Sequence, residues 1–169
     1  MKKFIGAICS IASAGLLFLF LSLSNLVSTT IATNVTTSMT GWDILQLNTE
    51  TNGLLLYKIF AIVAIVLAVL LIISALLLLL QNFGLLKVKI NFNLINNALL
   101  FVFMASAVVM LVAGILMAGA MSANFGGYVG NNTVVGLGIY LNLGVSIAAF
   151  VLALLFAKKV KQAKSRKRK

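Results

Sequence analysis

The sequence predicts an all-α membrane protein, an antiparallel bundle of four transmembrane helices with both termini in the cytoplasm. Three observations support this: apolar residues make up 62% of the 169 residues, charged residues only 9%, and four apolar runs are long enough to cross a bilayer. A soluble domain has about a quarter of its residues charged. This chain has too few charges to cover a water-exposed surface, so we assign it to a membrane.

The four predicted spans each exceed the roughly 20 helical residues that cross about 30 Å of hydrocarbon. Apart from Lys58, near the start of the second span, none contains a charged residue. The spans are Phe4–Val27, Leu54–Leu80, Leu94–Ser122 and Thr133–Phe156. We expect residues 1–157 to form one transmembrane unit, followed by a basic tail over residues 158–169.

Cationic residues gather on one side of the predicted bundle. Twelve of the 13 Lys and Arg residues precede the first span, separate the second from the third, or follow the fourth; Lys58, Asp43 and Glu50 lie on the other side. Short loops rich in Lys and Arg stay in the cytoplasm, so we expect a multi-pass plasma-membrane protein with both termini inside. A cleaved signal peptide is the alternative for the first span, although its apolar run of about 20 residues exceeds the usual 7 to 15.

The inventory of reactive side chains argues against an enzyme. The chain has no His, one Cys and two acidic residues. It cannot supply a His-based triad, a carboxylate pair within the membrane, or a metal cluster of His, Asp and Glu. We therefore predict no catalytic residue, no metal site and no cofactor. Cys9, in an apolar run, is expected to be an inert packed thiol.

The first outer segment, residues 28–53, is the predicted outer contact. Eight Ser and Thr residues between Ser28 and Thr40 favour an extended or short hairpin form. After them, Asp43 is predicted to cap a short helix whose apolar residues lie against the membrane interface. The candidate contact residues are Trp42, Asp43 and Ile44. The alternative is that Trp42 only anchors the segment at headgroup depth.

Small residues predict where the helices touch, because helix association in lipid depends on close packing and hydrogen bonds. They recur along one side of each span: Gly6, Ser10 and Ala14; Ala61, Ala64, Ala68 and Ala75; Ser106, Gly114, Ala118 and Ser122; Gly136, Gly144 and Ala148. In the fourth span, Asn142 is predicted to hydrogen-bond a neighbouring helix. The alternative is that Asn142 forms a polar patch on a permeation path.

The tail carries eight cations and no acid: Lys158, Lys159, Lys161, Lys164, Arg166, Lys167, Arg168 and Lys169. Each cation is worth about 1 kcal/mol near an anionic leaflet, so we expect contact with anionic lipid headgroups or with an acidic partner. No aromatic residue is interleaved, which argues against specific nucleic-acid binding. The alternative is that the tail only fixes the orientation of the last span.

The predicted topology resembles that of claudin-like four-helix (tetraspan) membrane proteins, including small bacterial ones. The shared features are four spans with both ends inside, a longer first outer loop carrying Gly41-Trp42, a short second loop, a Gly-rich fourth span and a basic tail. The Gly-Leu-Trp motif and the two outer cysteines of claudins are absent, so sealing or channel activity is not implied. The resemblance implies a small scaffold that associates laterally with itself or with a larger membrane complex.

These observations together predict a non-enzymatic scaffold or accessory subunit in the lipid bilayer. The alternative function is permeation, as an oligomeric pore, a holin-like protein or a component of a small transporter. No ionisable residue lies in the middle of a predicted span, and proton relays and substrate sites in membranes usually need one. The scaffold is therefore the preferred hypothesis.

Overall fold

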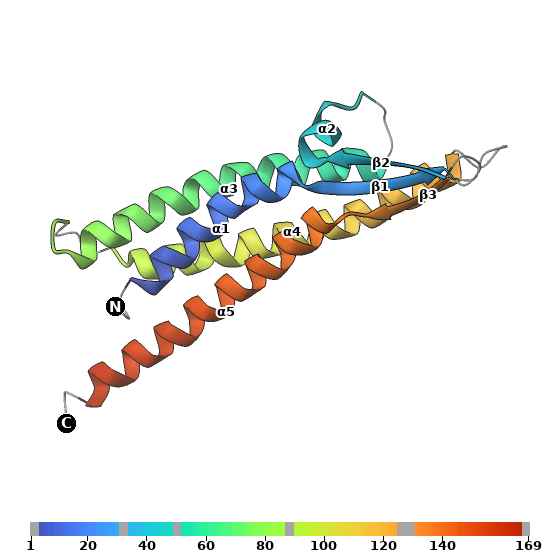
Figure 1. Ribbon diagram of the computed structural model, residues 1–169. Coiled ribbons are helices and arrows are strands. Elements are labelled where there is room, and N and C mark those ends of the chain that lie inside the picture. The colour runs from blue at the N-terminus through green and yellow to red at the C-terminus, as the bar shows by residue number, and fades with distance from the viewer. Residues whose placement is uncertain (1–3, 31–33, 49–51, 87–89, 125–130, 167–169) are drawn as a thin grey trace.

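The computed structural model describes residues 4–30, 34–48, 52–86, 90–124 and 131–166, and of residues 156–166 it describes the backbone alone. Its elements, in chain order, are α1 (Ile5–Ser22), β1 (Ser24–Thr30), β2 (Val35–Thr40), α2 (Gly41–Gln46), α3 (Asn52–Asn82), α4 (Phe92–Asn124), β3 (Asn131–Val135) and α5 (Leu137–Arg166). The long helices form the body of the molecule, and the strands and α2 lie at one end of it (Figure 1).

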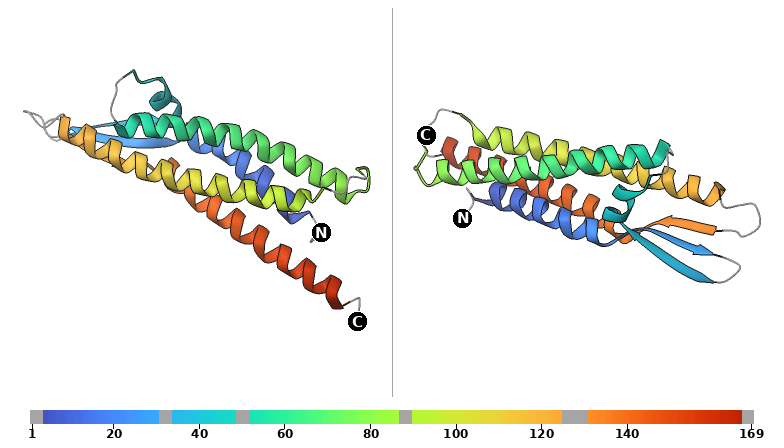
Figure 2. Two further views of the ribbon diagram at one scale, coloured as in Figure 1. Left: turned by 180° about the vertical axis from the view of Figure 1, so that it is seen from behind. Right: turned by 90° about the horizontal axis from the view of Figure 1, so that it is seen from above.

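Four helices, α1, α3, α4 and α5, are each long and apolar enough to cross a membrane. This finding confirms the predicted four-span, multi-pass protein. α3 packs against α4 and α1, and α5 packs against α1 and α4, so each helix has two main neighbours (Figure 2). Both chain ends lie at the end of the bundle opposite the strands (Figure 1). We call these two ends the terminal end and the sheet end.

A three-stranded sheet corrects the all-α expectation. Its strands are antiparallel in the order β2-β1-β3, so β1 pairs on both sides. Thr29 is opposite Thr36 in β2 and opposite Asn132 in β3. The β1–β2 hairpin agrees with the extended form predicted for the first outer segment. The pairing with β3 joins residues about a hundred positions apart, and local periodicity carries no signal for such a contact.

The sheet also shortens two of the predicted spans. α1 ends at Ser22 rather than at Val27, because the backbone from Ser24 onward bonds to neighbouring strands instead of continuing the helix. Thr133, predicted to open the fourth span, lies in β3, and α5 begins at Leu137. At the other end, α5 continues past the predicted Phe156 into the basic tail.

α3 ends in a Schellman motif at the terminal end. Gly84 has a φ of 77°, in the left-handed region that glycine adopts without strain. Its N–H donates to the carbonyl of Gln81, and the N–H of Leu85 donates to the carbonyl of Leu80. These two bonds satisfy carbonyls that the helix end would otherwise leave unpaired.

The small residues predicted for helix packing occupy the interior on three helices. Gly6 is half-buried on α1, beside Asn93 and Asn96 of α4. The other residues of this group are buried, with Ser122 half-buried: Ser10 and Ala14 on α1; Ala61, Ala64, Ala68 and Ala75 on α3; Ser106, Gly114, Ala118 and Ser122 on α4.

α5 packs through a different face from the predicted one. Gly144 and Ala148 are exposed, and a Cβ added to Gly144 would meet nothing within 4 Å. The buried residues of this helix include Ile139, Asn142, Ser146, Ala149 and Ala153. Gly136 is buried, but it precedes α5 and lies against the backbone of Ser24. Small residues occur on both sides of α5, so their spacing did not identify the packed side.

We predict that Gly53→Ala destabilises the protein. A Cβ at Gly53 would lie 2.6 Å from the backbone nitrogen of Met117, so α3 and α4 would have to separate. The free energy of unfolding should fall by about 1–3 kcal/mol, measured by circular dichroism during unfolding in detergent. The control is Gly119→Ala, since a Cβ there meets nothing within 4 Å and stability should stay unchanged or rise by about 0.5–1 kcal/mol. Equal stability of the two variants would contradict the prediction.

Candidate functional site at the sheet end

A capping box begins α2, next to the last residue of β2. Thr40 is the N-cap: its hydroxyl accepts from the backbone N–H of Asp43 (3.2 Å), while its own backbone N–H donates to Asp43 Oδ2 (2.9 Å). The Thr40 hydroxyl also lies 2.8 Å from Oδ2 and donates to it. The backbone bond first, and the hydroxyl bond second, lower the pKa of the Asp43 carboxyl, because both favour the carboxylate. Asp43 is therefore not the cap itself, as predicted, but the residue that bonds back to it.

Trp42 joins α2 to the end of α1. Its indole N–H donates to the hydroxyl of Ser22 (3.1 Å), and its ring stacks on Phe18 with centroids 6.4 Å apart and planes 18° apart. Ile44, on the other side of α2, is fully buried. Of the three candidate contact residues, only Asp43 and part of Trp42 are open to the surroundings. These contacts anchor α2 to the end of α1; the predicted depth of Trp42 at the headgroups stays a prediction.

Asn25 lies at the centre of the sheet end, where α2 and α5 both reach the junction of α1 and β1. The residue is 1% exposed, and its side-chain Nδ2 donates to the backbone carbonyl of Phe20 (3.4 Å). The backbone carbonyl of Asn25 accepts from the N–H of Gly136 (2.8 Å). A Cβ added to Gly41 would lie 2.5 Å from Asn25 Nδ2, and one added to Gly138 would lie 2.3 Å from Asn25 Oδ1. Only glycine at these two positions lets the two helices close on Asn25.

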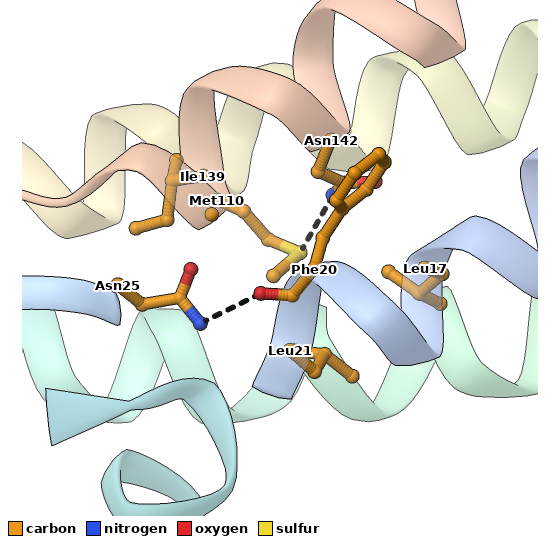
Figure 3. Close-up of a pocket in the computed structure, with 8 residues that line it drawn as sticks. Leu17, Phe20, Leu21, Asn25, Met110, Ile139 and Asn142 are labelled. Carbon is orange, nitrogen blue, oxygen red and sulfur yellow. Dashed lines mark hydrogen bonds between the residues drawn. The ribbon is translucent and has the colours of Figure 1, made fainter. Parts of the chain in front are cut away.

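A small hollow lies beside Asn25, between α1, α4 and α5 (Figure 3). No part of it is wide enough for the centre of a water molecule. Asn142 is 4% exposed there, and its Nδ2 lies 3.9 Å from the sulfur of Met110 on α4. The predicted bond from Asn142 to a neighbouring helix thus reaches a thioether, which is a weak acceptor. The lining is Leu17, Phe20, Leu21, Asn25, Met110, Gly138, Ile139 and Asn142.

The charged groups described at the sheet end make structural contacts. Lys58, half-buried near the start of α3, donates to the carbonyl of Leu47 and so ties the segment after α2 to α3. Asp43 belongs to the capping box. Within the described parts of the chain, no three His, Cys, Asp or Glu residues are grouped as metal ligands.

A second buried polar contact joins the helices near the terminal end of the bundle, and its central residue was not among those predicted from the sequence. Asn96 on α4 is fully buried, and its Oδ1 accepts from the hydroxyls of Ser10 on α1 and Ser74 on α3, each at 2.9 Å. Its Nδ2 donates to the carbonyl of Gly6 (3.3 Å). One side chain therefore links three helices. The sequence does contain a sign of this contact: Asn96 lies at the start of the third predicted span, and an amide in lipid needs a hydrogen-bond partner.

The basic tail is divided between α5 and residues outside the described part. The helix extends through Lys158, Lys159, Lys161, Lys164 and Arg166, whose backbone is helical. Lys167, Arg168 and Lys169 lie outside the described residues, as do Lys87 and Lys89. The first part of the tail is thus a direct continuation of the last spanning helix.

Compared with models of known protein families and with curated proteins, the chain matches none. The resemblance to claudin-like tetraspan proteins therefore stays an expectation from the sequence, and the four spanning helices are the part of it that the structure supports. What the sequence and the structure define together is the class: a multi-pass membrane protein of four packed spanning helices with a small sheet at one end.

We predict that acid loosens α2. The pKa of Asp43 is lowered in the folded protein, so its contribution to the cap is complete above the usual value of about 3.9 and is lost as the pH falls through the lower folded value. Trp42 is the only tryptophan, and its fluorescence reports on this helix. Emission should be constant from pH 7 to about pH 5 and should shift in stronger acid. The control is Asp43→Asn, which should show no such transition; a transition that persists would contradict the assignment.

We predict that Asn96→Leu weakens the bundle whereas Asn97→Leu does not. The first change removes the link between three helices, and with about 0.6 kcal/mol per interhelical bond the loss should be about 1–2 kcal/mol. Asn97 is the matched control, since its buried Oδ1 has no partner within the described structure and Leu removes an unpaired acceptor. Unfolding of both variants in mixed detergent, followed by circular dichroism, measures the difference. An equal loss in both would contradict the prediction.

Proposed function

We propose that the protein is a non-enzymatic scaffold or accessory subunit of the plasma membrane that associates laterally, with its termini and basic tail in the cytoplasm. The observation that carries this proposal is the use of the polar groups. Asn96 joins three helices, and Asn25 bonds to the end of α1 and to the residue before α5. Asp43 bonds back to Thr40, the cap of α2, and Lys58 holds the segment that follows α2. Membrane proteins that transport or react usually keep ionisable groups facing a cavity. Here the described polar groups serve the shape of the protein.

Gly144 supplies a surface for lateral association. It is exposed on α5, between Leu141 and Ile147, and the space above its Cα is open. A small residue on a lipid-facing surface lets a second helix approach closely, which is the main source of helix association in lipid. The contact face we propose is the exposed side of α5 near the sheet end, and the proposed partner is a second copy or a larger membrane protein.

The hollow beside Asn142 also bears on the alternative of a permeation path. A path would need space for at least one water molecule, and the space between α1, α4 and α5 is narrower than that. Asn142 instead faces Met110 across the helix contact (Figure 3). These observations argue against a water path through this helix contact within one chain.

Disulfide crosslinking in native membranes tests the proposal. In a chain with Cys9→Ser, we predict that Gly144→Cys forms an intermolecular disulfide, seen as a band at twice the mass of the chain or as an adduct with one repeated partner. The matched control is Val66→Cys, at an exposed position of α3 (53%). This variant should remain monomeric. Recovery of only monomer from Gly144→Cys, or equal crosslinking of both variants, would contradict the proposal.

A further inference from the structure

The last helix runs without a break from the bundle into the basic tail. α5 continues to Arg166, although its apolar sequence ends at Ala157. In Figure 1 the last part of α5 stands apart from the other helices. Because the helix is continuous, the 3.6-residue repeat determines on which face of α5 each position of the tail lies.

Burial defines two sides of α5 within the bundle. The exposed side is apolar, with exposed fractions of 41–51% for Ile147, Val151, Leu152 and Leu155. The buried side has exposed fractions of 1–6% for Asn142, Ser146, Ala149 and Ala153. The buried set recurs at intervals of three and four residues, and the 3.6-residue repeat places the exposed set on the opposite face of the helix.

The first two cations of the tail continue the exposed side. Residues three and four positions apart share a helix face, so Lys158 and Lys159 lie one turn beyond Leu155 on that face. By the same repeat, Val160 lies two turns beyond Ala153, on the buried side. Lys164, three turns beyond Ala153, is on that side as well.

The position of this pair along α5 matches the depth of lipid phosphates. From Leu137 to Ala157 the helix has about 20 residues, the length that crosses about 30 Å of hydrocarbon. Lys158 and Lys159 therefore follow directly where the hydrocarbon ends. The sequence from Leu137 to Lys169 contains no acidic residue, so no carboxylate in this part of the chain competes for the two ammonium groups.

We propose that Lys158 and Lys159, together with the exposed side of α5 next to them, form a binding site for one anionic phospholipid of the inner leaflet. The acyl chains contact Val151 and Leu155, and the phosphate group lies between the two lysines. The site rests on the membrane orientation given under the proposed function. It is separate from the lateral contact at Gly144, which lies about 10 Å closer to the sheet end than Val151 and about 21 Å closer than Lys158.

Continuity with the lipid-facing side favours a lipid over an acidic soluble protein as the occupant. Lys158 and Lys159 adjoin an apolar surface that faces acyl chains, whereas a soluble partner would first meet the cations at the end of the tail. In such a complex the acyl chains contact the apolar side of α5, and the phosphate group is attracted to the two lysines.

The test uses the purified full-length protein in detergent and native mass spectrometry to count bound lipids during titration with phosphatidylglycerol. The wild-type chain should retain one phosphatidylglycerol at concentrations where phosphatidylcholine does not bind, and inorganic phosphate should not displace it. Lys158→Gln with Lys159→Gln should weaken binding by about thirtyfold, from the loss of two cations near a phosphate. Unchanged binding in this variant would overturn the proposal.

Two controls separate this site from a general effect of the basic tail. Lys161→Gln with Lys164→Gln removes the same charge away from the centre of the lipid-facing side, and binding should be unchanged. The second control starts from the Lys158→Gln, Lys159→Gln variant and adds Ala157→Lys and Val160→Lys. The charge is then restored near the same depth but away from the lipid-facing side of α5, and binding should stay weak. Equal weakening by the first control, or recovery in the second, would overturn the proposal. Lipid counts on the isolated chain do not depend on a lateral partner, so this result and the crosslinking result can fail independently.

Discussion

A polar group between the helices of this chain is stabilised by a partner inside the protein, because lipid tails offer none. Two asparagines have such partners at opposite ends of the bundle. Asn96 bonds to α1 and α3 from α4, and Asn25 bonds within the junction of α1, β1 and α5. The helices between these two points pack mainly through alanine and leucine, which fit many alignments equally well. The bonds of Asn96 therefore favour one alignment of α1, α3 and α4.

Glycine makes the arrangement at the sheet end possible. Gly41 and Gly138 approach Asn25 from two sides, closer than any Cβ allows, and Gly53 lets α3 reach the backbone of α4. Trp42 and Lys58 then hold α2 and the segment after it against α1 and α3. The sheet end is consequently a single unit assembled from both connecting segments and the ends of four helices. This unit limits how far the spanning helices can slide past one another.

The same bundle has an outer surface that is not uniform. On α5, Gly144 leaves an open position near the sheet end, while Leu155 and the lysines after it combine an apolar face with charge near the terminal end. Because α5 is one continuous helix, the distance between Gly144 and the lysines after Leu155 is fixed. A scaffold with this surface would meet a neighbouring helix and an anionic lipid along one side.

Composition, apolar runs and local residue patterns were enough to determine four spanning helices and the short helix near Trp42, because both depend on local sequence alone. Ala61, Ala64 and Ala68 were identifiable because alanines on a Leu-rich helix mark its closely packed side. The sheet, the early end of α1 at Ser22, the link through Asn96 and the packed face of α5 depended on the tertiary structure. Each of them joins residues far apart in the chain, such as Thr29 with Asn132 or Ser10 with Asn96, and the free energy of such a contact exists only once both segments are in place.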